Sequence, residues 1–156
     1  MDATLRLTTR GRRILAFATA VAMVSSVRGA AAAAAADDKV VVVVSAESSV
    51  TEMPRLHLAD LYLGRTSRFP NGEPAEPIDQ EPASPARAAF YHTYLGRSPA
   101  EIKAHWSKII FTGRGRPPKD VPSGEDVREL VADNPRAIGY IERRLVDDSV
   151  RVVRVE

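Results

Sequence analysis

One group of polar residues in this sequence stands where the start of a helix could bind an anion. Ser84 is followed by Pro85, and a serine N-cap with a proline at the first helical position marks a helix start. Arg87 falls in the first turn, where the helix dipole disfavours a cation unless an anion lies nearby. Free N–H groups at a helix start bind oxyanions. The sequence therefore predicts either a small-oxyanion site at Ser84 and Arg87 or a simple N-cap beside a solvated arginine.

A second candidate lies in the loop of residues 113–122, which is rich in glycine, proline and basic residues. Arg114 and Arg116 could contact an anion or an acidic protein surface, and a solvated loop would show the same pattern. The two glycines of Gly113-x-Gly115 lack the spacing of a dinucleotide or P-loop motif. The loop is therefore a possible basic contact surface and not a nucleotide site.

Patterns for catalysis or metal binding are missing from the sequence. His57, His92 and His105 fall on different expected helices, with no paired spacing and no nearby carboxylate motif, so no metal site is predicted. The chain has no cysteine, which excludes disulfides, thiolate ligands and cysteine nucleophiles. No nucleophile motif such as G-x-S-x-G occurs. We therefore expect neither an enzyme nor a cofactor.

The elements that must position these residues follow from hydrophobic periodicity and turn residues. We expect helices over 56–62, 84–95, 98–111 and 123–134, and strands over 39–45, around Ile78, and over 137–141 and 150–155. The continuous valine run of the first strand is typical of a strand covered on both faces. This order of elements predicts one α/β domain in layers.

The N-terminal segment has the pattern of an export signal. Four arginines within residues 6–13 precede an uncharged apolar run over residues 14–24, which is shorter than the ~20 residues of a membrane-spanning helix. The alanine-rich stretch 30–36 offers sites to a signal peptidase. We therefore expect a signal peptide and cleavage region over 1–36, no stable membrane span, and a periplasmic or secreted domain over 37–156. The alternative is an amphipathic N-terminal helix of a cytosolic protein.

The charge balance depends on this segment. The full chain has 22 Lys and Arg against 20 Asp and Glu, a net charge of +2. Residues 1–36 hold five arginines and one aspartate, so 17 basic and 19 acidic residues remain, a net charge of −2. A slightly acidic domain is not expected to bind nucleic acid.

Four motifs of the chain occur in the order found in a known family. Residues 58–64 (LADLYLG) and 69–72 (FPNG) resemble the "L-x-x-I-F-x-G … W-x-x-G" stretch of phosphate-binding proteins of ABC-type phosphate importers. Residues 84–90 fall where those proteins place a serine-led helix start, and residues 137–140 (AIGY) resemble their "G-A-I-G-Y" strand. Asp79-Gln80 and residues 111–118 (FTGRGRPP) are similar to a group of short exported proteins described as phosphate-transporter substrate-binding-like.

The resemblance implies a single lobe of a periplasmic-binding-protein type II fold, similar to the second lobe of those proteins, with a mixed sheet flanked by helices. It also implies an anion loop. Aligned on Ser84, Gln80 takes the position of the family's arginine, Pro85 that of a glycine and Ala86 that of a threonine. Pro85 removes an N–H donor and Ala86 removes a hydroxyl. Ser84 and Arg87 remain as donors.

Two functions follow as expectations. The first is an exported solute-binding domain for a small oxyanion such as phosphate, held by Gln80, Ser84 and Arg87 and linked to ABC-type phosphate uptake. The second is an envelope interaction domain that keeps the fold without binding solute, and that contacts an envelope or transporter protein or forms a homodimer.

Overall fold

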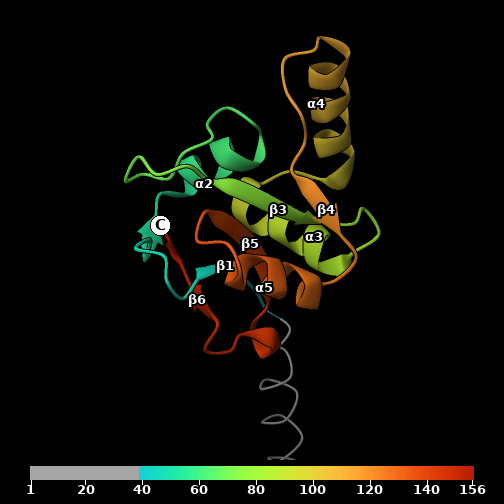
Figure 1. Cartoon of the computed structure of the whole chain (residues 1–156). Helices are drawn as coiled ribbons and strands as arrows, with labels where there is room; N and C mark the ends of the chain where they lie inside the picture. The colour runs from blue at the N-terminus through green and yellow to red at the C-terminus, as the bar shows by residue number, and fades with distance from the viewer. Residues whose placement is uncertain (1–38) are drawn as a thin grey trace, which may run out of the picture. The chain divides into compact units, whose positions relative to one another are not determined.

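The computed structural model describes residues 39–156 (Figure 1). The expected signal peptide and cleavage region, residues 1–36, lie outside the described residues. None of the helices within the described part of the chain is long and apolar enough to cross a membrane.

A five-stranded mixed sheet forms the centre of the domain, in the order β4-β3-β5-β1-β6. Strand β3 (Glu76–Gln80) runs parallel to β4 (Lys119–Val121) on one side and to β5 (Ala137–Glu142) on the other. Strand β1 (Val40–Ser45) runs antiparallel to β5 and to β6 (Val150–Val152). The predicted mixed sheet is confirmed.

Strand β1 lies between two cores, because every one of its residues is buried. Val42 and Val44 belong to one apolar cluster, whereas Val41 and Val43 belong to a second cluster on the opposite face of the sheet. Successive side chains of a strand point to opposite faces. The valine run is therefore a strand covered on both faces, as the sequence predicted.

Helices cover both faces of the sheet. On one face, α2 (Arg55–Tyr62) and α3 (Pro85–Phe90), which continues as the π-helical turn η1 (Tyr91–Leu95), pack into the first cluster. On the other face, α5 (Gly124–Ala132) packs against β5. A Cβ atom on Gly139 of β5 would lie 2.3 Å from a methyl carbon of Val127, so glycine permits this close approach. The predicted helices are confirmed, although the one expected over 84–95 changes to π-helical geometry at Tyr91.

The spacing of Ile102, Trp106, Ile109 and Ile110 predicts a buried stripe along helix α4 (Pro99–Phe111), and the structure confirms only part of it. Its first part packs through Ile102 and Trp106, as expected, but Ile110 is 56% exposed and Phe111 is 94% exposed. Figure 1 shows α4 extending away from the sheet toward the top of the view. The apolar stripe of this helix therefore runs beyond the core that it was expected to fill.

The short strands β4 and β7 (Arg154–Val155) differ from what the sequence predicted. The loop expected over 113–122 contains β4, which pairs in parallel with β3. The single strand expected over 150–155 is interrupted at Val153 and continues as β7, which pairs with β2 (Glu52–Met53) in a separate two-stranded sheet. The chain also makes a short 3₁₀ turn, η2 (Arg143–Leu145). Very short strands carry little periodicity, so the pattern could not reveal them.

Candidate functional site

Ser84 caps helix α3. Its Oγ accepts a hydrogen bond from the backbone N–H of Arg87 at 3.3 Å and donates one to Oε1 of Gln80 at 2.7 Å. Pro85 occupies the first helical position, as predicted. The structure therefore brings Gln80, Ser84 and Arg87 together and shows that the N-cap role of Ser84 is real.

The side-chain amide of Gln80 is occupied inside the protein. Gln80 is buried at the end of β3, and its Nε2 donates to the carbonyl oxygen of Tyr140 at 3.0 Å while its Oε1 accepts from Ser84. Both ends of the amide thus tie the start of α3 to β3 and β5. Gln80 therefore holds the capping side chain of Ser84 in position.

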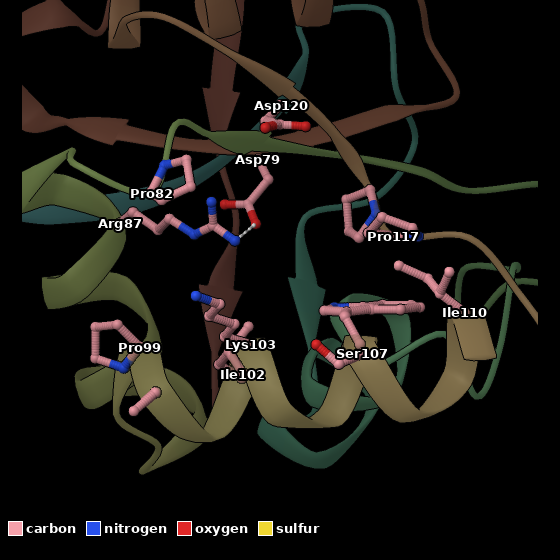
Figure 2. Close-up of a pocket in the computed structure, with 13 residues that line it drawn as sticks. Asp79, Pro82, Arg87, Pro99, Ile102, Lys103, Ser107, Ile110, Pro117 and Asp120 are labelled. Carbon is pink, nitrogen blue, oxygen red and sulfur yellow. Dashed lines mark ion pairs between the residues drawn. The ribbon is translucent and has the colours of Figure 1, made fainter.

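Arg87 is held by two partners at the end of β3. Its Nη1 donates to the carbonyl oxygen of Gln80 at 2.8 Å, and its Nη2 lies 3.1 Å from Oδ2 of Asp79 (Figure 2). The guanidinium also lies 5.6 Å from the ring centroid of Tyr91, within cation–π range. The side chain of Arg87 is 16% exposed, so the guanidinium is fixed in place and still reaches a surface. A guanidinium has five N–H donors, and these two contacts leave others available.

Asp79, which the sequence did not identify as a site residue, is the anchor of this arrangement. Its side chain is 3% exposed. Oδ1 accepts from the hydroxyl of Tyr140 and from the N–H of Gln80, and Oδ2 accepts from the hydroxyl of Tyr91 at 2.7 Å and pairs with Arg87. Four donors fill the four lone-pair positions of a carboxylate. Asp79 therefore orients Arg87 and has no acceptor left for a ligand.

The protonation states agree with these hydrogen bonds. Burial raises the pKa of Tyr91 and of Tyr140, and the negative charge of Asp79 raises both further, so the two phenols remain protonated donors. Burial also raises the pKa of Asp79, while the hydrogen bonds from Tyr140 and Tyr91 and the charge of Arg87 lower it. The negative charge of the buried Asp79 carboxylate is thus stabilised by the hydroxyls of Tyr140 and Tyr91 and by the charge of Arg87.

A cavity of about 480 Å³ opens in front of Arg87, between the end of β3 and helix α4. Such a position, at the carboxyl end of parallel strands, is where ligands bind in α/β sheets. Figure 2 shows the charged and apolar side chains that face it. The cavity is lined by Asp79, Pro82, Arg87, Pro99, Ala100, Ile102, Lys103, Trp106, Ser107, Ile110, Pro117, Pro118 and Asp120.

Two of these residues present donors that have no partner in the described part of the chain. Trp106 is 6% exposed, yet its buried Nε1 makes no hydrogen bond to any residue between 39 and 156. Buried donors in proteins nearly always have a partner. The Lys103 ammonium likewise forms no ion pair within residues 39–156. Arg87 and Ser107 add a guanidinium and a hydroxyl to the lining of the cavity.

The two arginines of the predicted basic loop lie elsewhere. Arg114 and Arg116 line a neighbouring depression beside the end of α4, which shares Ile110, Pro117, Pro118 and Asp120 with the cavity in front of Arg87. From this loop only Pro117, Pro118 and Asp120 reach the cavity in front of Arg87. The structure therefore brings Gln80, Ser84 and Arg87 into one cluster and leaves Arg114 and Arg116 outside it.

Two of the three histidines contact backbone carbonyls. Nε2 of His57 lies 2.8 Å from the carbonyl oxygen of Arg68, and Nε2 of His105 lies 3.0 Å from that of Leu63. Within residues 39–156 no group of three or more histidine, cysteine or carboxylate side chains could hold a metal ion.

Solved structures share this fold. No protein-family model and no curated protein matches the sequence. A structure from Clostridium perfringens, described as a phosphate ABC transporter substrate-binding protein with bound phosphate, matches with a TM-score of 0.60 and 23% identity over 76% of this chain and 45% of its own. An ABC-type phosphate transport receptor from Vibrio cholerae matches with a TM-score of 0.58 and 21% identity over 76% of this chain and 46% of its own.

A third structure, PstS from Borrelia burgdorferi, matches with a TM-score of 0.57 and 16% identity, over 76% of this chain and 47% of its own. The chain thus spans less than half the length of these structures. At such identities the likeness shows the fold. It confirms the α/β fold and the resemblance in fold to phosphate-binding proteins that the four motifs indicated.

Proposed function

We propose that this domain binds a small oxyanion, such as phosphate, at the charged end of the cavity in front of Arg87. The observation that carries the proposal is the set of donors that face this space. Arg87 is fixed by Asp79 and Gln80, while Lys103 and Nε1 of Trp106 lack partners within the described residues. Arg87 is held in place without a ligand, and charge-assisted hydrogen bonds from a fixed guanidinium suit oxyanions.

The roles of the predicted site residues differ within this proposal. Arg87 contacts the anion, because its guanidinium faces the cavity and keeps unused donors. Ser84 and Gln80 act as positioning residues, since their side-chain hydrogen bonds hold the start of α3 against β3 and β5. Lys103 adds a second positive charge from α4. Arg114 and Arg116 remain candidates for contact with a protein surface.

Isothermal titration calorimetry with inorganic phosphate tests this function. We expect saturable binding that weakens about tenfold in Lys103→Ala, the change that corresponds to the loss of ~1.4 kcal/mol. Lys108→Ala is the matched control, because Lys108 lies on the same helix but does not line the cavity. Phosphate binding that is absent, or equally strong in both variants, would refute the proposal.

The similar structures support a proposal for the physiological setting. The similar structures are described as a substrate-binding protein and a transport receptor, so we propose that this domain is exported and delivers its anion to an ABC-type phosphate importer. Export requires that residues 1–36 be removed as a signal peptide. Sequencing the N-terminus of protein from the periplasm or medium tests this part, and an intact Met1 on protein confined to the cytosol would contradict it.

An interaction domain is the second candidate, and the exposed end of α4 favours it. Ile110 and Phe111 place two large apolar side chains at the surface, next to the basic residues Arg114 and Arg116. Exposed apolar patches on soluble proteins often mark interaction sites. If a second copy covers this patch, sedimentation will show a dimer that Phe111→Ser converts to monomer. A monomer at all concentrations would exclude the homodimer.

A further inference from the structure

We propose that the anion bound in front of Arg87 carries an apolar organic group, as a phosphate monoester or an organic phosphonate does. This inference rests on the proposed function, because Arg87 and Lys103 must first hold the anionic head. It adds that the remainder of the same cavity holds an apolar tail.

The size of the cavity is the first argument. At about 480 Å³ it falls within the range of roughly 300–1,000 Å³ that is typical of sites for small organic molecules. A bare oxyanion such as phosphate has five non-hydrogen atoms and would fill only a small part of this space.

The order of side chains along α4 is the second argument. Lys103, Trp106, Ser107 and Ile110 follow the spacing i, i+3, i+4, i+7, which places them on one face of the helix, and all four line the cavity. This face therefore changes from a cation, through an indole N–H and a hydroxyl, to an aliphatic side chain. The step from Lys103 to Ile110 spans about 10 Å along the helix axis.

The cavity as a whole changes from charged to apolar in the same direction as this face of α4. Figure 2 shows Asp79, Arg87 and Lys103 toward one end of the cavity and Ile110 and Pro117 toward the other. Pro118 lines the cavity as well. Ile110 is 56% exposed, so a tail that covers it would remove apolar surface from water. The cavity thus offers cations to a head group and aliphatic contacts to a tail.

Trp106 and Asp120 contribute polar groups to the lining. Trp106 lines the cavity between the charged and apolar ends of α4, and its buried Nε1 has no hydrogen-bond partner within residues 39–156. Asp120 faces the cavity from β4 and forms no ion pair within residues 39–156. Its carboxylate lies beside Asp79, on the charged side of the cavity (Figure 2). The fitting ligand has an anionic head and an apolar tail.

Fluorescence titration of the full chain tests the inference, because Trp106 is the single tryptophan of the protein. The probes are butyl phosphate, inorganic phosphate and 1-butanol. We expect butyl phosphate to bind at least tenfold more tightly than inorganic phosphate, and 1-butanol to give no saturable change at the same concentrations. Ile110→Ser should reduce the preference for butyl phosphate. Phe111→Ser is the matched control, since Phe111 is exposed beside Ile110 and does not line the cavity.

The outcomes separate the inference from the proposed function. Equal affinities for the two phosphates, both weakened by Lys103→Ala, would overturn the inference and leave the oxyanion site in place. If butyl phosphate binds more tightly but Ile110→Ser leaves this preference unchanged, the inference is likewise overturned and the oxyanion site stays in place. Absence of binding by both phosphates to the folded protein would overturn the inference and the proposed function together.

Discussion

Removal of the Asp79 carboxylate is the sharpest test of the buried network behind the cavity. Asp79→Ala deletes the counter-ion of Arg87 and the acceptor for the hydroxyls of Tyr91 and Tyr140. Removal of one partner of a buried ion pair costs about 3–5 kcal/mol, because the other charge remains buried without compensation. The side chain of Arg87 keeps 16% exposure and thus some hydration. We therefore expect a loss of about 3 kcal/mol, near the lower end of that range.

Asp79→Asn should be milder, at about 1–2 kcal/mol, because the amide oxygen can still accept a hydrogen bond from a tyrosine hydroxyl. Asp120→Ala provides the matched control. Asp120 stands directly opposite Asp79 in the β3–β4 register, but it is exposed and unpaired within residues 39–156. Its substitution should change stability by no more than about 0.5 kcal/mol.

The assay is urea denaturation followed by far-UV circular dichroism, with free energies of unfolding extrapolated to water. The expected order of stability is wild type and Asp120→Ala together, then Asp79→Asn, then Asp79→Ala. If Asp79→Ala lost less than about 1 kcal/mol, or no more than Asp120→Ala, Asp79 would not anchor Arg87 in the way described.

Three further predictions concern the fold around the site. Gly139→Ala should lower the free energy of unfolding by about 1–3 kcal/mol, because the added Cβ would lie 2.3 Å from a methyl carbon of Val127. Urea denaturation measures this loss, and an unchanged midpoint would argue against the close packing of β5 and α5. Ser84→Ala should cost about 0.5–2 kcal/mol through loss of the cap, seen as a lower thermal midpoint. Burial raises the pKa of Asp79 in the folded state, so the folded protein binds a proton there more tightly than the unfolded chain does. Protonated Asp79 therefore stabilises the folded state most below the ordinary pKa of an aspartate, and this stabilisation declines as pH rises through the raised pKa. The stability of wild type relative to Asp79→Asn should therefore fall from pH 4 to pH 7, and a rise over this interval would reverse the sign of that shift.

The main helices and strands could be predicted because each has its own local signal. The valines of β1 are continuous, and Ser84, Ser98 and Ser123 each cap a helix, with a proline in the first helical turn after Ser84 and Ser98. The short strands β2, β4 and β7 have two or three residues each, too few to show a period. They form because tertiary structure supplies a partner strand.

The site was predictable only in part. Ser84 and Arg87 were visible as a helix start, and Gln80 entered through the resemblance to phosphate-binding proteins. Asp79 was missed as the partner of Arg87, because the pair joins the end of β3 to the first turn of α3 across a loop. An acidic residue at the end of a buried strand, eight positions before an arginine on the next helix, is the signal that could have suggested it.

The role of α4 could not be foreseen from its periodicity. The spacing of Trp106, Ile109 and Ile110 indicates an apolar face, but it does not tell a face that fills a core from one that borders a cavity. That distinction depends on where the residue 113–118 loop passes, which is a property of the tertiary fold. The donors of Lys103 and Trp106 therefore became visible as parts of one site only in the structure.

The most direct test of an oxyanion site in this cavity is the indole N–H signal of Trp106 in a ¹H–¹⁵N correlation spectrum. The chain has one tryptophan, so the spectrum contains one indole signal. We predict that inorganic phosphate shifts this signal saturably, that chloride at equal ionic strength does not, and that Lys103→Ala weakens the response. An indole signal that stays in place while phosphate rises to saturating millimolar levels would contradict the account.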